Sequence, residues 1–142
     1  MEISIKYYAV ELILRVFCGV IFMFQGYDKV FNVKLQGVIE TFRYEAQQKK
    51  IPSFLLTFSA YYTSYVEFFG GLLLILGLFK NYALSLLGLD LIMVAIAFSY
   101  LKPMWDMRFV FPRIILVSIL LILPTRWAYF SLDHLLRILL AK

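Results

Sequence analysis

Cysteine and histidine are almost absent from this sequence. The 142 residues include one cysteine, Cys18, and one histidine, His134. A single cysteine excludes an intramolecular disulfide and a CxxC motif, so the chain alone performs no dithiol chemistry. A lone histidine does not make a zinc site, and the sequence has no nucleotide-binding loop, catalytic triad or haem motif. We expect a protein that is not catalytic alone, with Cys18 as a small packing residue.

Charged residues are also few, at 16% of the chain, whereas hydrophobic residues make up 63% and the mean hydropathy is +0.83. A soluble chain of this size could not bury so much apolar surface, so the composition indicates an integral membrane protein. The net charge is +5. Because the lysines and arginines are spread over expected loops and helix ends, they fit lipid headgroups and not nucleic acid.

The apolar runs predict an all-α protein of one domain with four transmembrane helices, at about residues 8–27, 54–79, 82–100 and 108–123. We expect the first run to be a retained helix, because no small-residue cleavage site accompanies it. Four spans place both termini on one side of the membrane, and the positive charges do not decide which side.

Two shorter helices are expected outside the spans. Apolar residues at helical spacing predict an amphipathic helix at the membrane surface between the first two spans, although a solvated loop is the alternative. It should end before Ile51-Pro52, since the residue before proline disfavours helix. After the fourth span, Ser131 is a candidate N-cap, with Asp133 in the first turn. The leucines that follow indicate a short interfacial helix.

One charged residue lies deep inside each expected span: Arg15, Glu67, Asp90 and Arg113. Their depths, at about 1.5 Å of rise per residue, are roughly 10 Å for Arg15 and 12 Å for Asp90. Glu67 and Arg113 lie at roughly 18 and 17 Å. Because an unpaired buried charge is costly, we predict that Arg15 lies near Asp90 and Arg113 near Glu67, as two pairs or as one network of four. Glu11 is a local rival for Arg15.

We call the buried charged residues of the four spans the charge layer. Gln25 and Lys29, where the first span ends, are further polar candidates for it. Lys29 shares a helical face with Arg15, Gly19 and Gly26, and the glycines permit close helix approach. The layer has two interpretations that the sequence leaves open. It is a polar clasp that fixes helix packing, or it is a pocket for a quinone head group, an anionic ligand or protons.

Several motifs in chain order resemble the DoxX family of small four-helix membrane proteins. They are Leu14-Arg15 with Gly19 and Phe22; Gln25-Gly26-Tyr27-Asp28-Lys29; Ile51-Pro52; Glu67-x-x-Gly70-Gly71-Leu72-x-Leu74-x-Leu76-Gly77; and Ser131-Leu132-Asp133. Residues Arg15, Lys29, Glu67 and Gly70 match family positions. The chain departs from the family where the segment before Ser131 lacks glycine, and where Arg113 replaces an acid that often opens the fourth span.

The resemblance implies a multi-pass four-helix bundle in the bacterial inner membrane, with the lipid bilayer and membrane or peripheral redox proteins as partners. The related DoxD-type subunit belongs to thiosulfate:quinone oxidoreductase, so the expected role is an accessory subunit of a membrane redox or stress-response assembly. The resemblance allows a quinone as ligand, and oligomerisation is left open. The alternatives are a small transporter or quinone- or anion-binding protein, and a structural or assembly factor.

Overall fold

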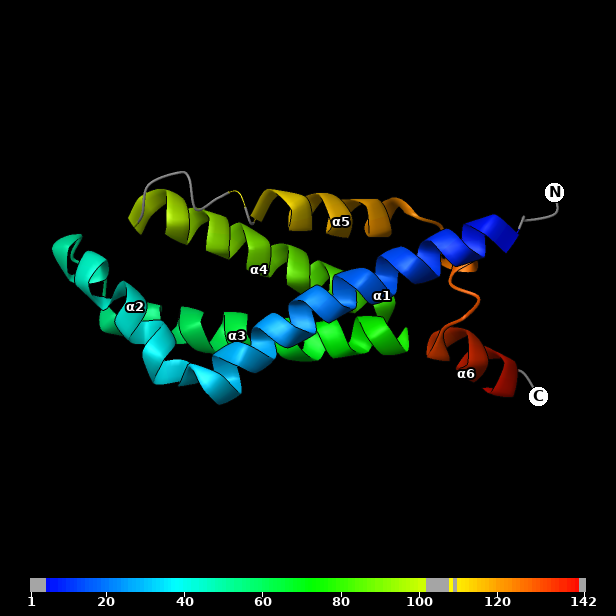
Figure 1. The fold of residues 1–142 in the computed structure, drawn as a ribbon, viewed down its shortest axis with the longest axis horizontal. Helices are drawn as coiled ribbons and strands as arrows, with labels where there is room; N and C mark the ends of the chain where they lie inside the picture. Colours follow the sequence, from blue (N-terminus) through cyan, green and yellow to red (C-terminus); the bar gives the residue numbers. More distant parts are fainter. Residues whose placement is uncertain (1–4, 102–107, 109, 141–142) are drawn as a thin grey trace.

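The described residues form helices. The structure, a computed structural model, describes residues 5–101, 108 and 110–140, which contain six α-helices and no strand (Figure 1). In chain order the elements are α1 (Ile5–Tyr27), the π-helical turn η1 (Asp28–Asn32), α2 (Lys34–Gln48), α3 (Ser53–Leu76), α4 (Lys80–Leu101), α5 (Val110–Ile122), the 3₁₀ turn η3 (Thr125–Trp127) and α6 (Leu132–Leu140).

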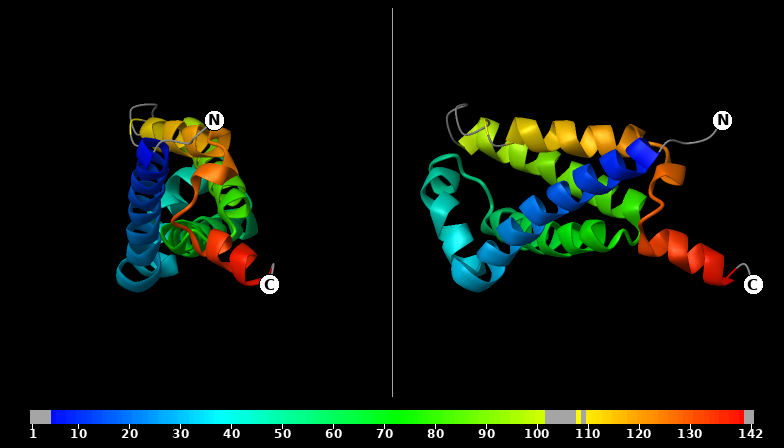
Figure 2. Two further views of the ribbon diagram at one scale, coloured as in Figure 1. Left: turned by 90° about the vertical axis from the view of Figure 1, so that its right-hand side faces the viewer. Right: turned by 45° about the vertical axis from the view of Figure 1, so that its right-hand side comes forward.

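Four helices, α1, α3, α4 and α5, extend along the long axis of the molecule (Figure 1). The helix α2 crosses one end of this group, while α6 and the start of α1 lie at the opposite end (Figures 1 and 2). The expected all-α arrangement is therefore confirmed, and so are the helix between the first two long helices and the short helix after the fourth.

Two segments are long and apolar enough to cross a membrane: residues 5–32, with a mean hydropathy of 1.8, and α4, with 2.1. The helix α5 is apolar but has 13 described residues, and α3 carries Tyr61, Tyr62, Thr63 and Ser64 in its first half. These polar side chains lower the average hydropathy of α3. Four spans thus stay a prediction, whereas two are supported by length and composition.

The third α-helix ends earlier than the sequence predicted, at Leu76 and not at Phe79. Gly77 follows with φ of 66°, a left-handed conformation that glycine adopts without a Cβ clash. The Gly77 N–H donates to the carbonyl of Leu74 at 3.1 Å, and the Leu78 N–H donates to that of Leu73 at 2.9 Å. This pair of bonds is a Schellman motif, which satisfies two terminal carbonyls.

Glycines bring α1 and α3 into backbone contact, which is the most extensive contact between helices. A Cβ on Gly26 would lie 2.2 Å from the Phe68 nitrogen, and one on Gly71 would lie 2.3 Å from the Met23 nitrogen. No side chain fits in these places. The expected packing of α1 through its glycine face is confirmed, with α3 as the partner.

The helix α2 packs on the bundle through its apolar side. Ala46 is buried, and the rings of Phe42 and Phe98 of α4 meet edge to face with centroids 5.6 Å apart. At the other end Ser131 caps α6, since its hydroxyl accepts a hydrogen bond from the His134 N–H at 3.2 Å. The amphipathic helix and the cap are confirmed, and their location at a membrane surface stays a prediction.

Replacement of Gly71 by alanine should weaken the α1–α3 contact. The added methyl group meets backbone atoms that cannot move aside, so we expect a loss of about 1–3 kcal/mol of stability. The measurement is the loss of helical circular dichroism during titration with SDS in mixed micelles. Gly88→Ala is the matched control, because its Cβ would have 3.8 Å to the nearest atom, on Val117. Equal stability of the two variants would contradict the backbone contact.

Candidate functional site

The first buried charge cluster joins the start of α1 to the start of α4. The Arg15 Nε donates to the Glu11 carboxylate at 3.1 Å, and the Lys80 ammonium lies 3.0 Å from the same Glu11 oxygen. All three residues are at most 4% exposed. The predicted local rival of Arg15 is therefore its partner. The sequence does not single out Lys80.

The other nitrogens of Arg15 bind backbone carbonyls. Nη1 donates to Leu74 at 2.6 Å and to Ile75 at 3.1 Å, which are terminal carbonyls of α3, and Nη2 donates to Phe130 at 2.6 Å. With its donors used in this way, Arg15 forms no ion pair with Asp90. The predicted Arg15–Asp90 pair is wrong, because estimates of depth along separate helices ignore a partner one turn away on the same helix.

Asp133 links α6 to the start of α4 at this end of the molecule. Its carboxylate accepts the backbone N–H groups of Phe79 at 3.0 Å and Lys80 at 3.2 Å, which start α4, and its own N–H donates to the Gly77 carbonyl at 3.1 Å. Asp133 thus caps α4 as well as standing in the first turn of α6. We call Glu11, Arg15, Lys80 and Asp133 the terminal cluster. Its polar groups bind one another or the backbone.

The second cluster lies nearer α2. The Lys29 ammonium is 2.6 Å from a Glu67 carboxylate oxygen and donates to the Thr63 hydroxyl at 3.1 Å. Thr63 and Glu67 are four residues apart on α3, so both face Lys29. The π-helical turn η1 carries Lys29, and such turns often occur at functional sites. The predicted proximity of Arg113 to Glu67 holds electrostatically, but the close ion-pair partner of Glu67 is Lys29.

Asp90 and Arg113 complete this group. Asp90 is fully buried, and no described residue donates a hydrogen bond of regular geometry to either of its oxygens. Glu67, Lys29 and Arg113 are its charged neighbours, and Arg113 also acts electrostatically on Glu67. We call Lys29, Glu67, Asp90 and Arg113 the floor cluster. Its two cations and two acids come from η1, α3, α4 and α5, and their formal charges cancel.

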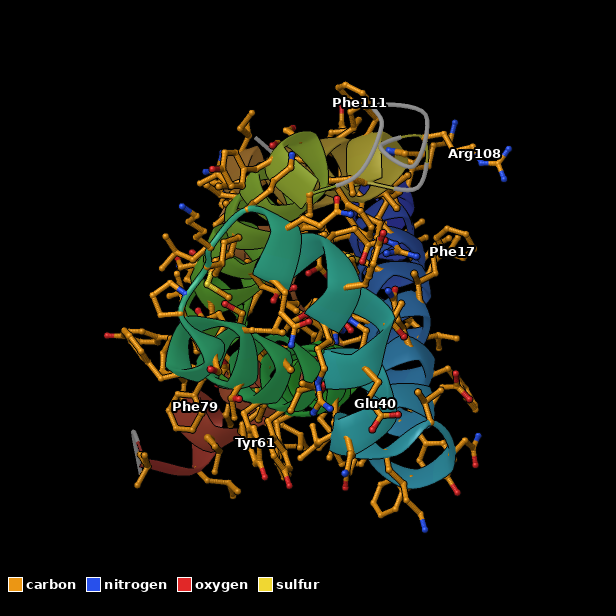
Figure 3. All side chains as sticks on the ribbon, turned by 90° about the vertical axis from the view of Figure 1, so that its left-hand side faces the viewer. Phe17, Glu40, Tyr61, Phe79, Arg108 and Phe111 are labelled. Carbon is orange, nitrogen blue, oxygen red and sulfur yellow. The ribbon has the colours of Figure 1, made fainter. Side chains whose placement is uncertain are left out.

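A cavity of about 740 Å³ lies against the floor cluster. Its polar lining residues are Gln25, Lys29, Ser59, Thr63, Tyr100 and Arg113. Apolar side chains of α2, α3, α4 and α5 form most of the remainder, and α2 lies across the end of the bundle that faces the viewer in Figure 3. An apolar cavity of this size with a few convergent polar groups is typical of small-molecule sites. Among the described residues, no group of three histidine, cysteine or acidic side chains is placed to hold a metal.

The comparison with protein families decides the relationship of this chain. The DoxX family model matches residues 10–100, which include most of α1, all of α2 and α3, and nearly all of α4. The chain belongs to the DoxX family. Comparisons with curated proteins and with solved structures gave no match. Membership of this membrane family, together with the two long apolar segments, indicates that the DoxX chain is a membrane protein.

The matched region of the DoxX protein contains Arg15, Gln25, Lys29, Glu67 and Asp90. The structure brings Lys29, Glu67 and Asp90 together with Arg113, and Gln25 lines the same cavity. Arg15 belongs to the other cluster. Sequence reasoning missed Thr63, although its spacing of four from Glu67 is a usable signal for a shared helix face.

Removal of one member of the Lys29–Glu67 pair should destabilise the DoxX protein more than removal of both. Lys29→Met leaves a buried carboxylate without its close cation, which costs about 3–5 kcal/mol. A double-mutant cycle with Glu67→Gln, followed by SDS titration, measures the coupling. The matched control is Arg43→Met on the exposed side of α2, expected within about 0.5 kcal/mol of wild type. Additive effects in the cycle would show that the two residues do not interact.

Proposed function

We propose that this DoxX protein crosses the bacterial inner membrane four times and is an accessory subunit of a membrane redox or stress-response assembly, in which it holds the head group of a quinone. The observation that supports this proposal is the apolar cavity that ends at the floor cluster. Family membership supports the membrane setting. The redox setting comes from the related DoxD-type subunit of thiosulfate:quinone oxidoreductase.

The polar lining suits a quinone head in chemical terms. Quinone oxygens accept hydrogen bonds, and Lys29 and Arg113 offer N–H donors at the cavity wall. Lys29 forms an ion pair with Glu67 and donates to Thr63, and no hydrogen bond of Arg113 is found among the described residues. The ring and chain of a quinone would contact the apolar wall. A bound quinone would supply two-electron carrier chemistry to a partner enzyme.

Two other roles give different expectations. In a small transporter or proton-linked carrier, Glu67 and Asp90 would be reached by water, and flux would depend on Glu67. In a structural or assembly factor, the floor cluster would only fix helix packing, and an exchanged pair, Lys29→Glu with Glu67→Lys, would retain function. The cavity favours the ligand-binding role, because a purely structural clasp does not need an unfilled space of this size beside it.

Quinone retention tests the proposed function. We expect the protein purified in mild detergent from bacterial membranes to carry a long-chain quinone, detected by mass spectrometry, together with redox partner proteins. Arg113→Met should weaken binding of added quinone about tenfold, because a hydrogen bond from a charged donor is lost. The control Arg43→Met should bind as wild type. A folded wild-type protein that neither retains nor binds quinone would exclude this ligand.

The four-span topology is tested by cysteine labelling. In a Cys18→Ser background, single cysteines at Lys6, Arg137 and Arg43 are treated with a membrane-impermeant maleimide in intact spheroplasts and in lysed membranes. Four spans predict that positions 6 and 137 share one side and that position 43 lies on the other. Labelling of all three positions from the same side would contradict the four-span arrangement.

A further inference from the structure

The cavity has exposed wall residues on two helices. Leu55 and Phe58 of α3 are 47% and 58% exposed, and Ile96 and Tyr100 of α4 are 64% and 55% exposed, yet all four line the cavity. The other described lining residues are buried or partly buried. A residue that lines a cavity and is also exposed marks its opening. The opening therefore lies between the first turns of α3 and the last turns of α4.

The end of the cavity that faces away from the floor cluster is covered by α2. Val38 and Phe42 line the cavity from this side, and Phe42 packs on Phe98. At the end of α2, the Lys49 ammonium donates to the Tyr100 carbonyl and lies 4.6 Å from the centre of the Tyr100 ring. These contacts tie α2 to α4. The described residues thus close the end of the bundle and leave the side open.

The level of the side opening is set by helix geometry. Leu55 is two residues and Phe58 five residues from the start of α3, which is about 3–8 Å along the helix axis. Thr63 at the polar end is ten residues from that start, about 15 Å along the axis. In the proposed four-span topology, the opening would meet the outer hydrocarbon of one leaflet. The polar end would lie near the middle of the bilayer.

We infer that the ligand of this cavity enters sideways from the bilayer between α3 and α4, and is therefore a membrane-dissolved lipid whose chain stays in that opening while its head reaches Lys29 and Arg113. The inference rests on the proposed function in so far as the cavity holds a ligand. It adds the route and the source. Ser59 and Ala97, small residues on the two facing walls, leave room along this route.

A photoreactive lipid tests the route. The full-length protein is reconstituted in vesicles of phosphatidylethanolamine and phosphatidylglycerol that contain a long-chain fatty acid with a diazirine on its chain. Its carboxylate suits the cations Lys29 and Arg113. After illumination, peptide mass spectrometry locates the labelled residues. We expect labels inside the cavity at Ala60 and Val94, in addition to those on lipid-facing residues.

Bulky side chains in the opening should prevent this interior labelling. Ser59→Trp, and independently Ala97→Phe on the facing wall, should lower labelling of Ala60 and Val94 about tenfold, because the added rings fill the route. Ser85→Trp on an exposed part of α4 away from the cavity is the matched control and should label as wild type. Circular dichroism in the same vesicles shows whether each variant is folded.

The results separate the route from the proposed function. Interior labelling that is lost in Ser59→Trp or Ala97→Phe supports sideways entry, whether or not a long-chain quinone competes with the probe. If the route is blocked as expected but quinone does not compete, sideways entry stands and the quinone proposal fails. No interior labelling of wild type, or unchanged labelling in both folded variants, overturns sideways entry.

Discussion

Compensation of buried charge is the constraint on which this structure depends. A charge in a water-poor helix bundle is tolerated where an opposite charge or several hydrogen bonds replace its hydration. The chain meets this requirement twice, with the terminal cluster at one end and the floor cluster nearer the other. Each cluster takes members from several helices. Each therefore restricts how those helices pack, in a medium where apolar contact alone specifies little.

The contact between α1 and α3 determines which charges meet. Gly26 lies against the backbone of Phe68, next to Glu67, and η1 begins two residues after Gly26. This close approach brings Lys29 within reach of Glu67. A larger residue at position 26 would separate the helices and leave the carboxylate without its near cation. The ion pair therefore depends on the glycines, because the close approach of the two backbones is what places Lys29 near Glu67.

The sequence predicts the helices, the glycine face and the buried charges correctly, but it gives Arg15 the wrong partner and misses the close partner of Glu67. Depth along straight, parallel helices was the basis for pairing Arg15 with Asp90 and Arg113 with Glu67. Lys29 and Lys80 lie at helix ends, and their long side chains reach inward to Glu67 and Glu11. The π-helical turn at Lys29 leaves no sequence signature. The end of α3, by contrast, was predictable from Gly77.

The two clusters differ in how many of their polar atoms have partners within the protein, and this difference bears on the proposed ligand site. Arg15 and Asp133 use their polar atoms on Glu11 and on backbone groups of α3, α4 and the segment before α6, and Lys80 forms an ion pair with Glu11. In the floor cluster, Lys29 and Arg113 border a cavity, and no hydrogen bond of Arg113 is found among the described residues. Buried polar groups without partners are costly, so they persist where something else compensates them. A ligand head group with acceptor oxygens would be a partner for Lys29 and Arg113 at the cavity wall, whereas Arg15 of the terminal cluster already donates to Glu11 and to three backbone carbonyls.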